Sequence, residues 1–81
     1  MELNHVKEML AYIVENLVEH PEEIVINQVE NHDTVVFQLK VAPSDMGKVI
    51  GRQGRIAKEI RVLVKNAGMR YNKRILVDIL D

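Results

Sequence analysis

Two glycines three positions apart, Gly51 and Gly54, place the strongest constraint on how this chain folds. The residues on either side, 46–50 and 55–67, have helical patterns, but glycine destabilises a helix interior. Glycine also adopts positive φ angles and has no Cβ, so it permits a sharp turn with exposed backbone amides. We therefore expect a short helix, a tight turn over residues 51–54 and a longer second helix.

The longer helix has apolar residues at helical spacing, which define the face expected to contact the core. They are Ile56, Ile60, Leu63, Val64 and Ala67. Gly68 is suited to end this helix in the left-handed conformation. Before the short helix, Ser44 is the expected N-cap, with Asp45 in the first turn.

The remaining apolar patterns predict one more helix and three strands. An amphipathic helix is indicated over residues 3–19, ending before Pro21. Residues 24–30 and 34–42 alternate as strands around a short polar segment, which predicts an antiparallel hairpin. A last strand, residues 75–79, follows a helical crossover and can pair in parallel, giving a mixed sheet. We expect a single α+β domain over residues 1–81, ordered α-β-β-α-α-β, with the helices on one face of a three-stranded sheet.

A net charge of −1 conceals a strong asymmetry along the chain. Residues 1–45 hold nine acidic residues and two lysines, a balance of −7, whereas residues 46–81 hold nine cations and three acidic residues, a balance of +6. A basic half of this size favours a nucleic-acid partner if its cations share one face. The alternative is a solvated surface on which the charges are segregated by chance.

The composition argues against several catalytic and metal-binding classes of protein. The chain has no cysteine, which excludes disulfides, thiolate metal sites and a cysteine nucleophile. Its three histidines lack metal-ligand spacing, and neither G-x-x-x-x-G-K-[ST] nor G-x-G-x-x-G occurs. No apolar run has the length of a membrane span, and the N-terminus lacks a signal-peptide pattern. We therefore expect a cytoplasmic, non-catalytic protein without a metal, a cofactor or a membrane-inserted segment.

The turn between the two helices has the chemistry of an anion site. Arg52 lies inside it and Arg55 follows it, while the glycines let a ligand approach the N-terminal amides of the next helix. A polyanionic backbone is therefore the expected ligand. An isolated G-x-x-G also occurs as a plain corner between helices, so the surrounding sequence decides between the two interpretations.

The segment GKVIGRQGRI, residues 47–56, follows a predicted hairpin and spans the junction between two helices. This combination resembles the K-homology (KH) domain, whose G-x-x-G loop clamps a short single-stranded backbone. The element order is similar to the type II, prokaryotic KH arrangement across essentially the whole chain. Within these KH proteins, the sequence most closely resembles the small bacterial KhpA family of stand-alone KH proteins. An aromatic content of 4% agrees with a groove in which bases rest on aliphatic side chains.

The resemblance implies RNA contacts on both sides of the turn. Residues 51–54 would clamp the backbone, and further contacts would come from the groove wall and from the variable-loop position, residues 68–73. Of the pair Val49 and Ile50, we expect one side chain to anchor the short helix and Ile50 to face the groove. The implied RNA-binding residues are Lys48, Ile50, Gly51, Arg52, Gln53, Gly54, Arg55, Ile56, Lys58, Arg70 and Lys73.

The resemblance further implies a non-catalytic module that holds roughly four nucleotides of single-stranded RNA. It implies an RNA-chaperone or post-transcriptional role with a larger cytoplasmic partner of the KhpB or Jag type, bearing on cell elongation and cell-wall homeostasis. Because so short a footprint binds weakly, a homodimer or a hetero-complex is expected to raise the affinity. Two alternatives stay open: a KH-fold interaction module whose partner holds most of the RNA, and a module that binds single-stranded DNA.

Overall fold

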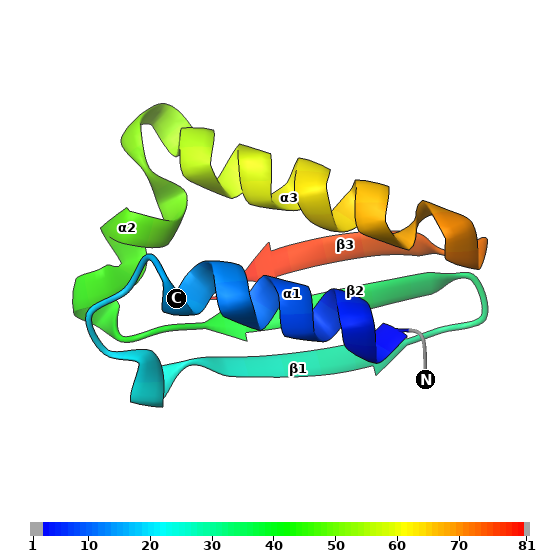
Figure 1. Cartoon of the computed structure of the whole chain (residues 1–81), viewed down its shortest axis with the longest axis horizontal. Coiled ribbons are helices and arrows are strands. Elements are labelled where there is room, and N and C mark those ends of the chain that lie inside the picture. The colour runs from blue at the N-terminus through cyan, green and yellow to red at the C-terminus, as the bar shows by residue number, and fades with distance from the viewer. Residues whose placement is uncertain (1–2, 81) are drawn as a thin grey trace.

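Helices cover one face of a three-stranded sheet in the computed structural model, which describes residues 3–80 (Figure 1). The helices are α1 (Leu3–Glu15), α2 (Met46–Ile50) and α3 (Arg55–Gly68), and the strands are β1 (Val25–Glu30), β2 (Thr34–Lys40) and β3 (Arg74–Ile79). The expected order α-β-β-α-α-β is therefore confirmed, with strand ends within two residues of those predicted. Within residues 3–80, no helix is both long enough and apolar enough to cross a bilayer.

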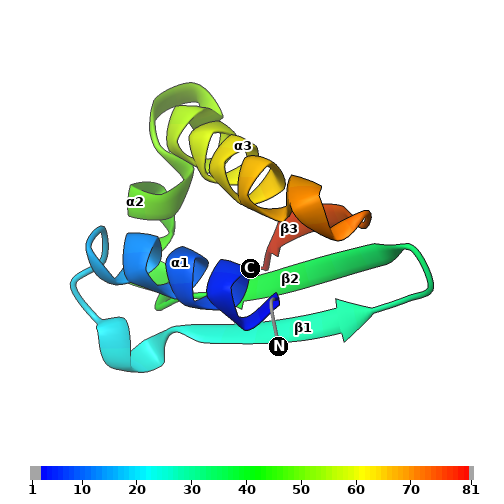
Figure 2. The same cartoon turned by 45° about the vertical axis from the view of Figure 1, so that its right-hand side comes forward.

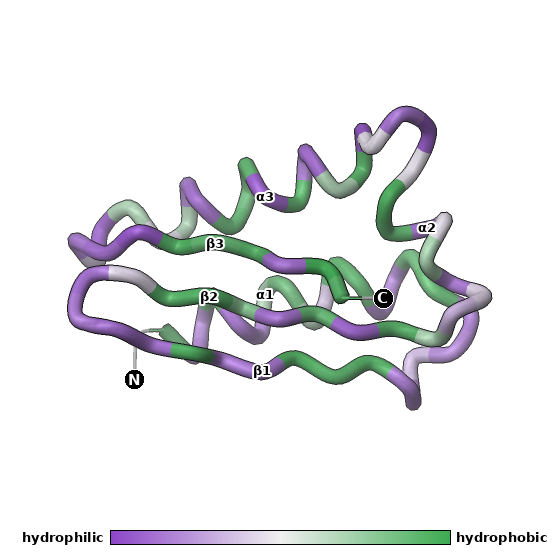
Figure 3. Tube along the Cα trace, turned by 180° about the vertical axis from the view of Figure 1, so that it is seen from behind, coloured by the Kyte–Doolittle hydropathy of each residue, from purple (hydrophilic) through white to green (hydrophobic). Residues whose placement is uncertain are grey.

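The sheet is mixed, as expected. β2 lies in the centre, with β1 antiparallel on one side and β3 parallel on the other. The hairpin between β1 and β2 is closed by Asn31, whose N–H donates to the Thr34 carbonyl at 2.7 Å. Val36 aligns with Val29 and Leu76 on the face of the sheet that no helix covers, here called the open face. Figure 3 views the molecule from this side.

The core lies between the sheet and the helices. Alternate residues of β2 are completely buried, and α1 and α3 each supply an apolar stripe above them. The buried apolar cluster comprises Val6, Leu10, Val14, Val35, Phe37, Leu39, Val41, Val49, Ile60, Val64, Ile75 and Val77. This packing fixes α3 over β3, which in turn fixes the position of the turn at its N-terminus.

The first helix is shorter than the sequence predicts, because α1 ends at Glu15 rather than near residue 19. The Asn16 side-chain amide donates to the Tyr12 carbonyl at 2.7 Å, and the Leu17 N–H bonds to Val14 only three residues back. Leu17 still packs against the core after the helix ends. The early end lets the chain turn so that the Glu19 and His20 amides face Asp45.

Asp45, rather than Ser44, is the residue that organises the start of α2. Its side chain is fully buried and accepts hydrogen bonds from the backbone N–H groups of Glu19 at 3.1 Å and His20 at 3.0 Å. Ser44 is exposed within a 3₁₀ turn and makes no cap, so the N-cap prediction is wrong. Burial alone raises the pKa of the Asp45 carboxyl. The two backbone amide donors and the charges of the His20 and Lys48 side chains outweigh burial, so the pKa is lowered.

Two predictions about α3 are also wrong. Gly68 has φ −90° and continues the helix, while Asn72 is the left-handed residue beyond it. Glycine is needed at position 68 because a Cβ there would lie 2.0 Å from the Ile75 Cδ1 atom. Leu63 is 48% exposed, since the buried face of α3 is centred on Ile60 and on small residues that let the helix approach the sheet.

Candidate nucleic-acid interface

The turn between α2 and α3 stands at one end of the molecule and has an unusual backbone (Figure 2). Gly51, Gln53 and Gly54 have φ angles of 77°, 57° and 75°, so three of its four residues are in conformations that favour glycine. A Cβ on Gly51 would lie 2.5 Å from the Ile56 Cγ1 atom, whereas a Cβ on Gly54 would meet nothing within 4 Å. Gly51 is therefore required by packing, and Gly54 leaves open space beside the backbone.

Backbone amides of this turn are free to bind an anion. The N–H groups of Gly51 and Gly54 donate to the carbonyls of Gly47 and Gly51 at 2.9 and 3.1 Å. Within residues 3–80, the amides of Arg52 and Gln53 have no hydrogen-bond acceptor. The first turn of α3 also has no side-chain cap and no acidic residue. Open amides and the positive end of the helix dipole together favour a negatively charged ligand.

The adjacent pair Val49 and Ile50 has two different environments. Val49 is completely buried and anchors α2 in the core, while Ile50 is 37% exposed. Ile50 thus offers apolar surface next to the exposed side chains of Arg52 and Arg55. The structure places Ile50, residues 51–56 and Lys58 at the same end of α3, although Ile56 is half-buried beneath Gly51.

Lys48 lies one turn before Gly51, but carboxylates already surround its ammonium group. The Lys48 Nζ atom is 3.7 Å from Asp45 Oδ1 and 3.7 Å from Glu19 Oε2. Its side chain is 42% exposed, so both ion pairs are within reach of solvent. A phosphate at this position would have to compete with the Glu19 carboxylate for Lys48.

Arg61 is a basic residue of this surface that the sequence analysis missed. Its Nε atom donates to the Val77 carbonyl at 3.2 Å and so links α3 to β3. Arg61 lines a hollow of about 410 Å³, and Lys65 lines an adjoining hollow of about 440 Å³ that shares Ile75 and Leu76. Lys58, Arg61 and Lys65 are spaced i, i+3 and i+7, a pattern that the sequence contains and that predicts one helix face.

The outer edge of β3 borders these hollows and presents unpaired backbone groups. Arg74 and Leu80 donate their N–H groups toward β2, to the carbonyls of Asp33 and Leu39. Because neighbouring residues of a strand bond to opposite sides, Ile75, Val77 and Ile79 direct their amides and carbonyls to the open edge, where the Val77 carbonyl already accepts the bond from Arg61. A groove between the basic face of α3 and this edge therefore offers both positive charge and hydrogen-bonding groups.

Two of the expected contacts, Arg70 and Lys73, lie at the opposite end of α3. A helix of 14 residues is about 20 Å long, so the structure does not bring them next to the turn. Lys73 forms an ion pair with Glu30 in β1, and its hydrogen bond lowers the pKa of the Glu30 carboxyl. Arg70 lines a separate cavity with α1.

The 3₁₀ turn after α1 brings together three side chains that sequence spacing did not suggest. Ligand atoms of His20, Glu22 and Glu23 lie within 4.8 Å of one another, which is close enough to share a metal ion. His20 Nδ1 is 3.6 Å from Glu22 Oε2, so these two groups already contact each other. Exposed clusters of this kind are common in proteins that bind no metal, and among residues 3–80 no further metal-ligating side chain joins these three.

The chain is similar to known KH proteins over almost its whole length. The family model described as "KhpA/KhpB, KH domain" matches residues 7–79. A protein described as "RNA-binding protein KhpA" from Clostridium perfringens is 47% identical over 74 residues, covering 91% of this chain and 99% of that protein. Proteins of the same description from Oceanobacillus iheyensis and Chlamydia pneumoniae are 51% and 44% identical, covering 91% and 93% of this chain and 99% and 96% of their own lengths.

Proposed function

Because the chain belongs to the KhpA/KhpB family of KH domains, we propose that it binds single-stranded RNA through the turn Gly51–Gly54. The observation that carries this proposal is the pair of open amides at Arg52 and Gln53, set at the uncapped N-terminus of α3. A phosphate at this point would accept hydrogen bonds from the backbone and lie between the side chains of Arg52 and Arg55. The relatives described as RNA-binding proteins support RNA as the ligand.

The groove between α3 and the edge of β3 would hold the bases of the bound strand. Ile50 and the aliphatic surface near the turn offer apolar contact, while Lys58 and Arg61 follow the backbone along α3. The footprint is roughly four nucleotides, as is usual for a KH groove. Such a footprint binds weakly alone, so we expect either self-association or a partner with its own RNA-binding surface.

In the cell, this module acts as a non-catalytic RNA chaperone or post-transcriptional regulator in the cytoplasm. Its partner is a larger KH-containing protein of the KhpB or Jag type, and the pathway bears on cell elongation and cell-wall homeostasis. The support for these proposed cellular roles is the resemblance to the family. Co-purification of such a partner from the native cell, with and without ribonuclease, tests whether the association needs RNA.

The test of RNA binding reverses the charge of the turn and leaves the core untouched. The double substitution Arg52→Asp and Gln53→Asp removes one cation and adds two carboxylates where the phosphate is expected. Position 53 has a positive φ angle, which Asp tolerates better than most residues. We expect the variant to stay folded and to lose detectable affinity for a single-stranded RNA.

A matched control makes the same charge change on the open face of the sheet. Lys40→Asp with Asn27→Asp alters two exposed residues by the same total charge. This control should bind RNA nearly as well as wild type. If the turn variant and the control bind equally well, the turn is not the phosphate site.

The exposed apolar residues of α3 favour a second candidate function, a protein-interaction module. Val62 and Leu63 are 44% and 48% exposed on a helix whose other exposed side chains are mostly basic. Sedimentation of the purified chain with and without RNA separates the two functions, since a stable dimer without RNA affinity supports the second.

Competition between RNA and DNA of the same sequence decides which single strand is preferred.

A further inference from the structure

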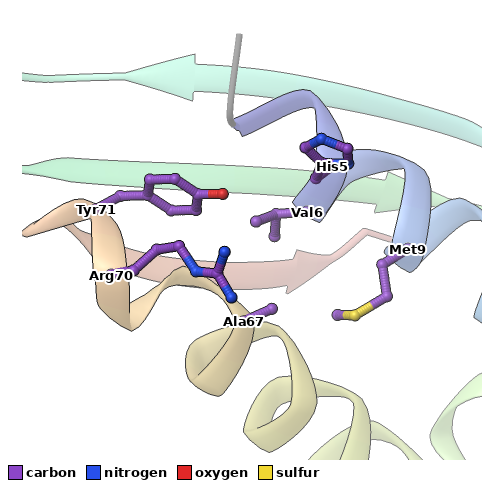
Figure 4. A pocket seen from close by; sticks show the side chains of 6 residues that line it. All are labelled: His5, Val6, Met9, Ala67, Arg70 and Tyr71. Atoms are coloured by element: carbon purple, nitrogen blue, oxygen red, sulfur yellow. The ribbon is translucent and has the colours of Figure 1, made fainter.

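A cavity of about 320 Å³ lies between the first turns of α1 and the C-terminal end of α3 (Figure 4). Its lining residues are His5, Val6, Met9, Ala67, Arg70 and Tyr71. About 20 Å of helix separates this cavity from the turn at the N-terminus of α3. The cavity also shares no lining residue with the two hollows beside β3, so it is distinct from the groove proposed above.

Arg70 brings a positive charge to the cavity, and none of the lining residues that the structure describes is acidic. Its guanidinium carbon lies 6.0 Å from the centre of the Tyr71 ring, a distance typical of a cation–π contact. Within the described part of the chain Arg70 forms no ion pair, whereas Lys48 and Lys73 both contact carboxylates. The Arg70 guanidinium is thus available to an anionic ligand.

The rest of the cavity is apolar, with two further groups that can contact a ligand. Val6 is 2% exposed, and Met9 and Ala67 pack against the core, so they form a fixed floor. Figure 4 shows Arg70 and Tyr71 extending from the 3₁₀ turn Met69–Tyr71 toward α1, where His5 faces them. The site therefore combines an apolar floor, an aromatic ring, a permanent cation and an imidazole.

We propose that this cavity is a second nucleotide subsite, which accepts one base and its phosphate from a strand longer than the turn and groove can hold. The faces of a base are flat and apolar, so they match the floor and the Tyr71 ring, and the Arg70 fork matches a phosphate. A volume of about 320 Å³ is at the low end of small-molecule sites, which suits a single nucleotide rather than a helix or a folded segment. The inference rests on the proposed RNA-binding function and assigns Arg70 a role away from the turn.

The test compares a short and a long single strand, because only the long one can occupy both sites. Oligoadenylates of about four and about twelve nucleotides are titrated against wild type, Arg70→Gln and Tyr71→Leu. Each variant should weaken binding of the longer strand by about tenfold, as expected for loss of a charge-assisted contact or of a stacked base. Binding of the shorter strand should change by less than about twofold.

Matched controls remove the same chemistry elsewhere on the surface. Tyr12→Leu changes a tyrosine that is 68% exposed outside the cavity, and Lys40→Gln removes an exposed cation on the open face of the sheet. Arg70 is exposed, so its variant tests the proposal even if replacement of the half-buried Tyr71 disturbs the fold. The two controls, Tyr12→Leu and Lys40→Gln, should bind the longer strand as wild type does.

The outcomes separate this proposal from the function on which it rests. Wild-type affinity of both cavity variants for the longer strand overturns the subsite and leaves the cavity to a protein contact. Equal weakening of both strands also overturns it, because the variants would then act through the fold or the groove. A third outcome is that the turn variant Arg52→Asp with Gln53→Asp binds both strands normally while the cavity variants bind only the longer strand more weakly. In that case the turn is not the phosphate site, and the cavity proposal stands.

Discussion

Gly51 and Ile56 are packed so closely that a Cβ on Gly51 would lie 2.5 Å from the Ile56 Cγ1 atom. Gly54, at the other end of the same turn, also has a positive φ angle but has open space where its Cβ would be. The two glycines of one motif therefore have different physical roles. Gly51 holds the turn against α3, and Gly54 keeps a backbone surface clear.

The two alanine variants should separate these roles. Gly51→Ala combines a left-handed alanine with a steric clash and should lower the free energy of unfolding by about 3 kcal/mol. Gly54→Ala carries only the conformational cost, about 1 kcal/mol, but places a methyl group where a phosphate would approach. Urea denaturation gives the stabilities, and RNA titration of the folded Gly54 variant should show at least about tenfold weaker binding. Equal destabilisation by both variants would contradict the assignment.

Asp45 should make the stability of the fold depend on pH in the acid range. Its pKa is lower in the folded state than the value of about 3.9 for an unfolded aspartate. The ionised carboxylate therefore stabilises the fold above about pH 4, and that stabilisation is lost as the pH falls through the folded-state pKa. Asp45→Asn should have a lower melting temperature than wild type at pH 7, and the two should converge as the pH falls below the folded-state pKa of Asp45.

The measurement for Asp45 is the thermal midpoint across a pH series. Asp78→Asn is the matched control, because it removes an aspartate that is exposed on the sheet. The melting temperatures of wild type and Asp45→Asn are plotted against pH. If the two curves stay parallel from pH 7 to the acid limit, the buried carboxylate does not stabilise the fold through its charge.

Glu19 should oppose RNA binding because its carboxylate lies 3.7 Å from the Lys48 ammonium group. Glu19→Gln frees that cation and removes a negative charge near the turn, while the backbone bond to Asp45 remains. Since exposed ion pairs contribute less than about 1 kcal/mol, the RNA affinity should rise by about twofold to fivefold. Glu15→Gln removes an exposed carboxylate one turn earlier and is the control. Equal gains from both variants would indicate a general charge effect, with no specific role for Lys48.

Gly68 should tolerate alanine only when Ile75 is made smaller. A Cβ at position 68 would lie 2.0 Å from Ile75 Cδ1, so Gly68→Ala should cost about 1–3 kcal/mol despite the higher helix propensity of alanine. Ile75→Val removes that Cδ1 atom and should recover part of the loss, so the double variant should be more stable than the sum of the single changes predicts. Strict additivity in urea denaturation would show that the two residues do not constrain each other.

The sequence predicted the fold where a residue pattern has only one structural solution. Alternation in residues 34–40, helical spacing in α3 and the glycine pair gave the element order and the mixed sheet. The sequence pattern wrongly predicted Leu63 on the core face and Gly68 as the left-handed end of α3. The depth at which α3 packs depends on Ile75, which is distant in the sequence. No local rule indicates that a helical glycine is required by a strand that follows it.

For the candidate site, the sequence identified the turn but not its electrostatic surroundings. The residues around Gly51–Gly54 were expected from the motif, whereas the contacts of Lys48 with Glu19 and Asp45 depend on the loop after α1. Arg61 could have been found from its spacing to Lys58 and Lys65, but its bond to Val77 depends on the parallel placement of β3. Tertiary packing therefore decides which cations are free to meet a phosphate.

The most direct test of the central claim is to follow the backbone amides by NMR while a four-nucleotide single-stranded RNA is added. We predict the largest chemical-shift changes at the amides of Arg52, Gln53, Gly54 and Arg55, with smaller changes along α3 and at the edge of β3. The affinity should fall with salt, with a log–log slope of about −0.7 for each phosphate contacted. Shifts confined to the open face of the sheet, with the amides of residues 52–55 unchanged at saturation, would contradict the account.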